Sequence, residues 1–383
     1  MSEMSYLEKL LDGVEVEWRN LGDTSLFEIA NNGRKPVKAS LRIAGETPYY
    51  GANNIQDYVD GYTHDGEYVL IAEDGSASLE NYSIQYATGK FWANNHVHVV
   101  RGKERVHTRF LYHYLCIVNF LPFLTGGGRA KLTKGQLIEI PVPIPCPDNP
   151  EKSLAIQSEI VRILDKFTAL TAELTAELNM RKKQYNYYRN QLLSFEGGSV
   201  EWKSLGEVAI ITIGAFVRKD KQNPDADYPV YNGGRTPTGY YEDFNNDGDK
   251  IIVSARGANA GFVNKSSTPY WAGNSCYSIS VRSTEQLHWM YVYYYLKQSE
   301  TKLTGIQQKG GIPAVSKKQM EDLLLPIPSK SEQVRIVTIL DKFDTLTSSI
   351  TEGLPREIEL RQKQYEYYRD LLFSFPRPET ASN

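Results

Sequence analysis

The 383-residue sequence has little cysteine, little net charge and no long apolar run. Its three cysteines, Cys116, Cys146 and Cys276, form no CxxC pair, and this sparse, odd set favours a reducing compartment over a disulfide framework. The formal net charge of −3 argues against binding to nucleic acid through overall charge alone. The most apolar stretch, residues 110–124, is broken by polar residues, so we expect no membrane span. The N-terminal sequence has no signal-peptide core, which favours a cytoplasmic location.

Motifs of catalysis are also missing. The sequence contains no GxxxxGK[ST] phosphate loop, no GxSxG nucleophile motif and no [DN]PP[YF] turn of the amino-methyltransferase type. His96 and His98 alternate on a possible strand and form a weak candidate metal pair, but no third ligand follows at a recognisable spacing. We therefore predict no metal site and no catalytic residues, and expect a binding and positioning protein.

What is present is an internal repeat that covers nearly the whole chain. "VEWRNLG" at 16–22 returns as "VEWKSLG" at 200–206, and "ILDKF" occurs at 163–167 and 339–343. "RKKQYNYYRNQLLSF" from Arg181 returns as "RQKQYEYYRDLLFSF" from Arg361. The matches keep one order and nearly one offset, which indicates a tandem duplication.

Each copy consists of a globular part followed by a helical part. Short β-branched and aromatic runs bounded by Gly, Asn and Asp turns predict strands, and long 3–4 periodic segments predict helices. The fold class is therefore α+β, with two similar globular domains and two long helices. The predicted parts are a first domain at 1–147 whose N-terminal segment completes the second helical region, a central helical region at 148–197, a second domain at 198–328, a C-terminal helical region at 329–376 and a disordered tail at 377–383.

The helical regions carry apolar residues at alternating steps of three and four, the pattern of a coiled-coil seam. We expect the two helices to pair antiparallel, because each must leave its own domain and return to it. Two amphipathic helices that pack on separate domains are the alternative. Gly353 and Pro355 predict a kink or break near Leu354. The seam residues are Leu170, Leu174, Leu178, Tyr185, Tyr188, Leu346, Ile350, Leu354, Tyr365 and Tyr368.

Two sets of residues are candidates for contact with duplex DNA, whose repeat suits a pair of similar domains at a fixed spacing. Acid-free cationic loops precede each helical region and can hold phosphates; their residues are Arg129, Lys131 and Lys134, and Lys309, Lys317 and Lys318. Segments that differ between the copies are candidate base readers, because Asn pairs with adenine and Arg with guanine; they contain Tyr49, Tyr50 and Asn53, and Tyr231, Asn232, Arg235 and Arg256. The alternatives are solvated loops and core or turn roles.

The duplication, the paired "ILDKF" and "KQY.YYR" segments and "GGIPAVSKKQMEDLLLPIP" at 310–328 resemble the DNA-specificity (S) subunit of type I restriction–modification enzymes. The opening "MSEMSYLEKLLDGVEVEW" and the TAEL tetrapeptides are similar to the IC branch of that family. The resemblance implies two target-recognition domains, each contacting one half of an asymmetric, interrupted DNA site. It implies that the helical regions form the spacer and dock two methyltransferase subunits, which restriction motor subunits then join.

The resemblance also implies that this chain is inactive alone and binds no cofactor. AdoMet, ATP and Mg²⁺ would belong to the partner subunits. Two other functions stay open from the sequence: the specificity subunit of a fused restriction–methylation enzyme, and a coiled-coil scaffold that presents two protein- or sugar-binding domains.

The segment "TAELTAEL" at 171–178 repeats one tetrapeptide inside the first helical region. The second region has three tetrads, 347–358, at the corresponding place. One tetrad is slightly more than a helical turn, so adding one keeps the apolar face roughly aligned and lengthens the helix by about 6 Å. That length is about one to two base-pair steps. We therefore expect the segment to help set the spacer between two half-sites.

Overall fold

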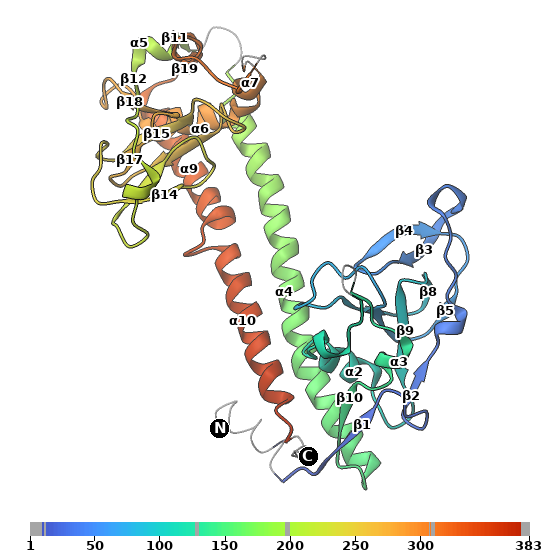
Figure 1. Cartoon of the computed structure of the whole chain (residues 1–383). Helices are drawn as coiled ribbons and strands as arrows, with labels where there is room; N and C mark the ends of the chain where they lie inside the picture. The colour runs from blue at the N-terminus through green and yellow to red at the C-terminus, as the bar shows by residue number, and fades with distance from the viewer. Residues whose placement is uncertain are drawn as a thin grey trace. The chain divides into compact units, whose positions relative to one another are not determined.

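The computed structural model describes residues 10, 13–126, 130–195, 200–305, 307 and 311–376. The chain divides into two compact units, the first made of Met1–Glu173 with Ile358–Asn383 and the second of Leu174–Glu357. Each unit combines one sheet domain with helical segments from both halves of the chain (Figure 1).

The first unit contains two four-stranded sheets and a separate pair of strands. One sheet has the antiparallel order β2 (Phe27–Ile29), β9 (Val97–Gly102), β6 (Tyr68–Ala72), β7 (Ile84–Ala87). The other has the order β4 (Ile55–Val59), β3 (Ala44–Tyr50), β8 (Lys90–Ala93), β5 (His64–Asp65), and β1 (Val16–Asn20) pairs with β10 (Pro141–Pro145). The short helices are η1 (Asn31–Gly33), η2 (Ala39–Leu41), α2 (Thr108–Leu115), η3 (Leu121–Phe123) and α3 (Lys134–Leu137).

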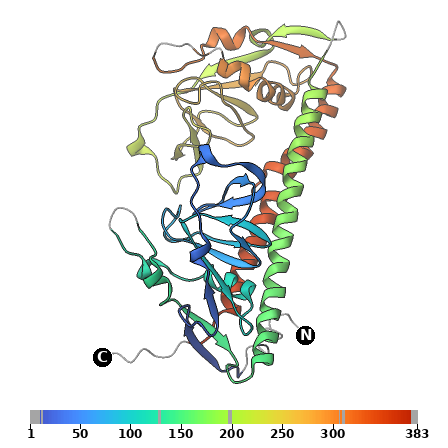
Figure 2. The same ribbon diagram turned by 90° about the vertical axis from the view of Figure 1, so that its right-hand side faces the viewer.

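Strand β6, with the sequence YVLIA, is buried along its whole length. Successive side chains of a strand point to opposite faces of its sheet. Val69 and Ile71 accordingly pack in a core with residues of α2, whereas Tyr68 and Leu70 pack in a second core with Phe91 of β8. An apolar run without alternation therefore forms the central strand between two cores. Figures 1 and 2 show the strands and α2 of this unit beside the N-terminal part of α4 (Pro150–Leu192).

The second unit repeats this arrangement. Its four-stranded sheet has the order β12 (Ala209–Ile213), β18 (Cys276–Val281), β15 (Lys250–Ser254), β16 (Val263–Ser266). Its three-stranded sheet has the order β14 (Gly239–Tyr241), β13 (Tyr228–Tyr231), β17 (Trp271–Ala272), and β11 (Glu201–Ser204) pairs with β19 (Leu324–Ile327). The short helices are α5 (Leu205–Val208), η4 (Lys219–Lys221), α6 (Trp289–Gln298), α7 (Glu300–Gly305) and α8 (Lys317–Glu321).

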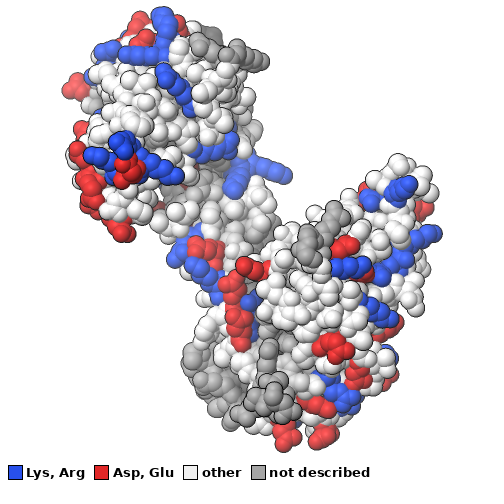
Figure 3. Space-filling view, in the orientation of Figure 1, with Lys and Arg blue, Asp and Glu red and all other residues white. Residues whose placement is uncertain are grey.

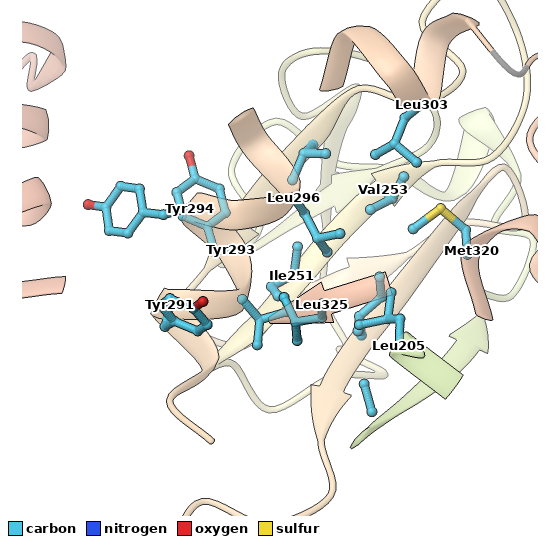
Figure 4. Packing of buried hydrophobic residues seen from close by; sticks show 14 of the residues in the cluster. Leu205, Ile251, Val253, Tyr291, Tyr293, Tyr294, Leu296, Leu303, Met320 and Leu325 are labelled. Atoms are coloured by element: carbon cyan, nitrogen blue, oxygen red, sulfur yellow. The ribbon is translucent and has the colours of Figure 1, made fainter. Parts of the chain in front are cut away.

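The core of the second unit lies between its four-stranded sheet and its helices. Figure 4 shows the aliphatic side chains of Leu205, Ile251 and Val253 gathered together, with Tyr293 and Tyr294 of α6 extending away from them. The hydroxyl of Tyr294 donates a hydrogen bond of 2.5 Å to Oδ1 of Asp341, which belongs to α9 (Lys330–Ser348). The tyrosines thus connect the sheet domain to a long helix.

The long helices contact each other within both units. In the first unit, Phe167 of α4 stacks on Tyr368 of α10 (Leu354–Leu372), with ring centroids 5.2 Å apart. In the second unit, Tyr188 of α4 stacks on Phe343 of α9 at 5.6 Å. An earlier residue of α4 therefore contacts a later residue of the second helical region, and a later residue of α4 contacts an earlier one. This is the order expected of an antiparallel pair.

The second helical region is interrupted between Ser348 and Leu354, whereas α4 is continuous (Figure 1). Gly353 has φ +83°, and a Cβ there would lie 2.4 Å from the carbonyl oxygen of Thr345. Pro355 falls in the first turn of α10, where its missing N–H breaks no intrahelical bond. The predicted break near Leu354 is confirmed. The placement of Ile350 in the seam is wrong, because Ile350 lies in the break and is 79% exposed.

The remaining predicted seam residues lie on helices, and all but one of them are partly buried; Tyr188 is 40% exposed although its ring stacks on Phe343. Arg181 is a polar residue at a place in α4 where the apolar pattern of the seam is interrupted. Its guanidinium bonds Glu177 and Gln184 of the same helix. The partly buried residues are Leu170, Leu174, Leu178, Tyr185, Leu346, Leu354, Tyr365 and Tyr368.

Each sheet domain is fixed to its own long helix by one repeated contact. The side-chain oxygen of Gln157 in α4 accepts from the backbone N–H of His107 at 2.8 Å, before α2. The side-chain oxygen of Gln333 in α9 accepts from the backbone N–H of His288, also at 2.8 Å, before α6. Both glutamines are fully buried. These contacts make His107 and His288 equivalent, and therefore also His113 and Tyr294, six residues further on.

That second equivalent pair differs in chemistry. His113 is fully buried; its Nε2 donates to Asp165 of α4 at 2.8 Å, and its Nδ1 lies 3.2 Å from the hydroxyl of Tyr365 on α10. Burial lowers the pKa of His113 to about 4, against the opposing effect of Asp165. The histidine is therefore neutral near pH 7. It joins the first sheet domain to both long helices.

Among the residues that the structure describes, no helix is long and apolar enough to cross a membrane.

Candidate nucleic-acid interface

In the first unit, several connections meet at one end of the sheets, and we call them the first loop cluster. Nδ2 of Asn53 donates to the carbonyl of Gly75 at 2.9 Å, and its Oδ1 accepts from the N–H of Ala77 at 2.8 Å. Asp74 and Lys131 form an isolated β-bridge. The predicted residues Asn53 and Lys131 thus belong to one surface. The first loop cluster comprises residues 51–54, 73–77, 94–96 and 130–134.

A carboxylate at the base of this cluster carries two ion pairs. Glu73 accepts from Nη1 of Arg34 at 2.6 Å, and Nζ of Lys131 lies 3.0 Å from its other oxygen. Burial acts to raise the pKa of Glu73, but these two partners hold it below its ordinary value. The hydrogen bond to Glu73 in turn raises the pKa of Lys131. Lys131 is 46% exposed, so its ammonium remains available to a phosphate.

The two histidines of the weak metal hypothesis do not converge. Nδ1 of the half-exposed His96 lies 2.5 Å from Oδ1 of Asp74. His98 is buried; its Nε2 donates to the carbonyl of Leu132 at 2.7 Å, and its Nδ1 lies 2.9 Å from the amide nitrogen of Asn31. Burial lowers the pKa of His98. In the described part of the chain, no three His, Cys, Asp or Glu residues gather as metal ligands.

The second unit has a corresponding second loop cluster. Oδ1 of Asn232 accepts from the N–H of Ser275 at 3.2 Å. Nε of Arg235 donates to Asn259 at 3.3 Å. The exposed guanidinium of Arg256 forms no hydrogen bond or ion pair with any residue that the structure describes. The structure thus brings the predicted Asn232, Arg235 and Arg256 together. The second loop cluster comprises residues 232–235, 255–259, 273–275 and 311–317.

Backbone hydrogen bonds make the two clusters comparable residue by residue. In the first, Glu73 N–H donates to His96 O at 2.8 Å, and Leu132 N–H donates to Glu73 O at 2.7 Å. The second repeats these bonds with Ala255 in place of Glu73, at 2.8 and 2.9 Å, to Ser275 and from Val315. The next residues are Asp74 and Arg256.

The glycines that follow them, Gly75 and Gly257, both have positive φ, +69° and +95°. An L side chain rarely adopts this backbone conformation, and glycine adopts it without steric cost. The same turn therefore leaves both strands. At one backbone position the first copy presents a carboxylate and the second a guanidinium.

The predicted tyrosines occupy less exposed positions than the loops. Tyr49 is 1% exposed and its hydroxyl accepts from the N–H of Val37 at 3.1 Å, so it supports the fold and is not placed to touch a base. Tyr50 and Tyr231 are half-buried and lie edge-on to Phe91 and Tyr270. Burial raises the pKa of both hydroxyls. They are therefore hydrogen-bond donors at neutral pH.

Each predicted cationic loop is followed by a short helix, and in the second copy this helix places acidic side chains beside the lysines. Lys134 is the first residue of α3 and makes no ion pair with a described residue. Its equivalent, Lys317, begins α8, and its Nζ lies 3.6 Å from Glu321; Nζ of Lys318 lies 2.7 Å from Asp322. Acids beyond the predicted loop therefore lie one turn further along the same helix face. Arg129 and Lys309 lie outside the described residues.

One pair of cationic loops escaped the sequence prediction. Nε1 of Trp92 donates to the carbonyl of Lys35 at 2.7 Å, and Nε1 of Trp271 donates to the carbonyl of Ala215 at 2.8 Å. These bonds mark equivalent loops, which carry the exposed cations Lys35, Lys38, Lys219 and Lys221. The signal was present as "RKPVKASLR" at 34–42, with four cations and no acid. Figure 3 shows acidic and basic side chains interspersed on the visible face of each unit, as expected from the small net charge.

The long helices also expose a pair of equivalent tyrosines that the sequence prediction left out. Tyr187 is 61% exposed and Tyr367 is 53% exposed. Each lies edge-on to the next tyrosine of its helix, with centroids 5.4 Å apart. Exposed aromatic side chains with a polar tip are enriched at protein interfaces. The repeated "YNYYR" and "YEYYR" sequences carried this signal, but helical periodicity selected only the tyrosines at seam positions.

Comparison with known proteins agrees with the repeat. The family model for the type I restriction modification DNA specificity domain matches residues 14–181 and 199–360. A putative type I restriction enzyme specificity subunit of Haemophilus influenzae is 47% identical, over 97% of this chain and 98% of the relative. The EcoR124I/EcoR124II type I specificity subunit of Escherichia coli is 40% identical over the full length of both chains.

The fold comparison points the same way. The crystal structure of a type I restriction–modification system S subunit from M. genitalium superposes with a TM-score of 0.69 at 16% identity, covering 96% of this chain and 98% of that one. The two sequence relatives are named as specificity subunits, in agreement with the prediction of a non-catalytic chain. The structural match agrees with the predicted fold of two α+β domains. The chain belongs to the family of type I restriction–modification DNA specificity subunits.

Proposed function

We propose that this chain reads a bipartite, asymmetric DNA site, with one half contacted by the first loop cluster and the other by the second. One observation carries the proposal: two clusters with the same backbone hydrogen bonds present different side chains at one backbone position, Asp74 in the first and Arg256 in the second. A duplicated scaffold with diverged tips is what reading two different half-sites requires. The cations that would contact phosphates are Lys131, Lys134 and the exposed lysines of the loops bonded by Trp92 and Trp271, which are Lys35, Lys38, Lys219 and Lys221.

The long helices would set the separation of the half-sites. The division between the two units falls inside TAELTAEL, between Glu173 and Leu174. A tetrad added there lengthens the part of α4 that lies between the two sheet domains in sequence. We expect that adding one TAEL lengthens the unread spacer by one to two base pairs and leaves both half-sites intact. A control variant with one added alanine rotates the seam by about 100° and should abolish assembly. An unchanged spacer in the TAEL variant would contradict the proposal.

The helices would also dock two methyltransferase subunits, which restriction subunits then join. The exposed, equivalent Tyr187 and Tyr367 suit one contact repeated for two copies of the same partner. The relatives support this assembly through their names, which place them in type I restriction enzymes. AdoMet, ATP and Mg²⁺ would then be used by those partners.

The direct experiment combines stoichiometry with methylation mapping. The chain is co-purified with its methyltransferase subunit, and the complex is expected to contain one copy of this chain and two of the partner. DNA from cells that carry both is then searched for methylated adenine. We expect a two-part motif with an unread spacer. Methylation at one continuous sequence, or methylation that does not depend on this chain, would overturn the proposal.

A further inference from the structure

We propose that Asp74 is a base-reading residue of the first half-site and that its ligand is an exocyclic amino group, that of cytosine or adenine. The inference rests on the proposed function and names a specific contact within it. The carboxylate would be the counterpart of Arg256, which occupies the same backbone position in the second copy and is suited to guanine.

The equivalence of the two positions comes from the backbone and not from side-chain similarity. Asp74 and Arg256 each follow a residue whose N–H and carbonyl are bonded to the neighbouring loops in the same way. Each forms an isolated β-bridge, Asp74 with Lys131 and Arg256 with Ala314. Each is followed by a glycine of positive φ. Asp74 is therefore the candidate reader of the first copy at the position that Arg256 occupies in the second.

The carboxylate of Asp74 is held by one hydrogen-bond partner, which bonds one of its two oxygens. Because a carboxylate only accepts hydrogen bonds, Nδ1 of His96 carries the proton in their 2.5 Å contact with Oδ1. The Asp74 side chain is 36% exposed, and its Oδ2 makes no hydrogen bond with any described residue. His96 thereby fixes the direction of the carboxylate and leaves one oxygen able to accept.

The charge of Asp74 also needs an explanation at a DNA interface, since a carboxylate repels phosphates. A purely structural role would be to neutralise Lys131, but the ammonium of Lys131 is bonded to Glu73 at 3.0 Å and not to Asp74. An acid in this place acts as a discriminating element. It accepts from cytosine N4 or adenine N6 and disfavours the acceptor edges of guanine O6 and thymine O4.

The neighbouring groups agree with a readout role. Asn53, which holds the turn after Asp74 through Gly75 and Ala77, fixes the loop that carries the carboxylate. Arg34 and Lys131 bond Glu73, the residue before Asp74. Their positive charges would offset the repulsion between the Asp74 carboxylate and the DNA phosphates. The second cluster needs no such compensation, because Arg256 is itself a cation.

The test uses the complex of this chain with its methyltransferase subunit. After the wild-type site is mapped, duplexes that carry each single base-pair replacement in both half-sites are compared for affinity. The variants are Asp74→Ala, which removes both acceptor oxygens, and Asp65→Ala, at an exposed aspartate on β5 away from the loops, as the matched control. We expect Asp74→Ala to lower the discrimination at one position of the first half-site by roughly tenfold or more, where the wild type prefers cytosine or adenine.

The outcomes separate the inference from the proposed function. If the wild-type complex methylates no two-part site, the proposed function fails. If it does so but Asp74→Ala behaves like Asp65→Ala, the inference fails alone. A uniform loss of affinity over all duplexes, or a change confined to the second half-site, would also overturn the inference, because neither is the loss of one base contact.

Discussion

The two loop clusters share their backbone hydrogen bonds and differ in charge. In the first cluster, Glu73 and Asp74 follow strand β6; in the second, Ala255 and Arg256 follow β15. The two main-chain hydrogen bonds that join the end of each strand to the neighbouring loops have lengths within 0.2 Å of each other in the two copies. Since main-chain bonds do not depend on side-chain identity, the side chains of the loop clusters can differ between the copies while the backbone arrangement is kept. This separation of support from readout is what a duplicated recognition protein needs.

The attachment of each sheet domain to its helices shows a similar contrast. The buried glutamines Gln157 and Gln333 make the same contact, whereas His113 in the first unit has become Tyr294 in the second. Both side chains reach the aspartate of "ILDKF", at Asp165 or Asp341. The position requires a donor to that carboxylate, and imidazole or phenol can supply it. Four predictions use the differences between the copies.

The largest effect is expected in the cores. Phe110 and Tyr291 occupy equivalent, fully buried positions in α2 and α6. Replacing either by Ala should lower the free energy of unfolding of its own unit by about 3–5 kcal/mol, because a large cavity is left. Tyr291→Phe removes only the hydrogen bond to the carbonyl of Pro326 and should cost about 1 kcal/mol.

Hydrogen exchange measured on the peptides that contain β6 and β15 distinguishes the units. Phe110→Ala should accelerate exchange in β6 and leave β15 unchanged, and Tyr291→Ala should do the reverse. Equal acceleration in both strands would show that the units do not unfold separately and that the division between them has no energetic meaning.

The next effect concerns pH. The pKa of His113 is about 4 in the folded first unit and about 6.5 when unfolded, so the unfolded chain binds more protons between these values. The stability contributed by neutral His113 is therefore present above pH 6.5 and is lost as the pH falls, by about 3 kcal/mol near pH 4. Asp165, Arg109 and Tyr365 face the ring, and Asp165 opposes the shift.

The equivalent Tyr294 does not titrate in that range, because the ordinary pKa of a phenol is about 10 and burial raises the pKa of Tyr294 further. Exchange in β6 should accordingly become faster relative to β15 when the pH is lowered from 7 to 5, after correction for intrinsic rates. His113→Gln should reduce this difference. A pH response of the wild type that matches His113→Gln would mean that the histidine is protonated in the folded chain.

A smaller effect separates two equivalent lysines. Lys134 has no ion pair with a described residue, and Lys317 lies 3.6 Å from Glu321. A phosphate contact contributes about one unit to the slope of log affinity against log salt. Lys134→Gln in the assembled complex should therefore lower that slope by about one, and Lys317→Gln by less. Equal slopes for the two variants would show that the ion pair does not restrict Lys317.

Much of the scaffold followed from the sequence, because it depends on periodicity and on an internal repeat. The helices, the break before Leu354 and the α+β domains are products of such local patterns. Ile350 was misplaced because the periodic pattern continued through a break that Gly353 fixes with its positive φ. Tyr49 was predicted to read a base because a short run of aromatic residues does not reveal which of its side chains are exposed.

The candidate site was less accessible from the sequence, because it depends on contacts between distant loops. Asp74 and His96 are 22 residues apart, and only the fold brings them together. Glu321 and Asp322 were overlooked because they follow the cationic loop, and only the helical turn of α8 returns them to Lys317 and Lys318. Arg235 and Arg256 could be proposed because divergence between copies is itself a sequence signal.

The central claim is that each copy reads one half of a two-part site through its own loop cluster. The most direct measurement is a map of methylated adenines in DNA from cells that carry the methyltransferase partner with either the wild-type chain or Arg256→Gln. We predict that the wild type yields a two-part motif and that Arg256→Gln relaxes or changes a guanine position in one half by about 1–3 kcal/mol of discrimination, with the other half and the spacer unchanged. A change in both halves, or none in either, would contradict the account.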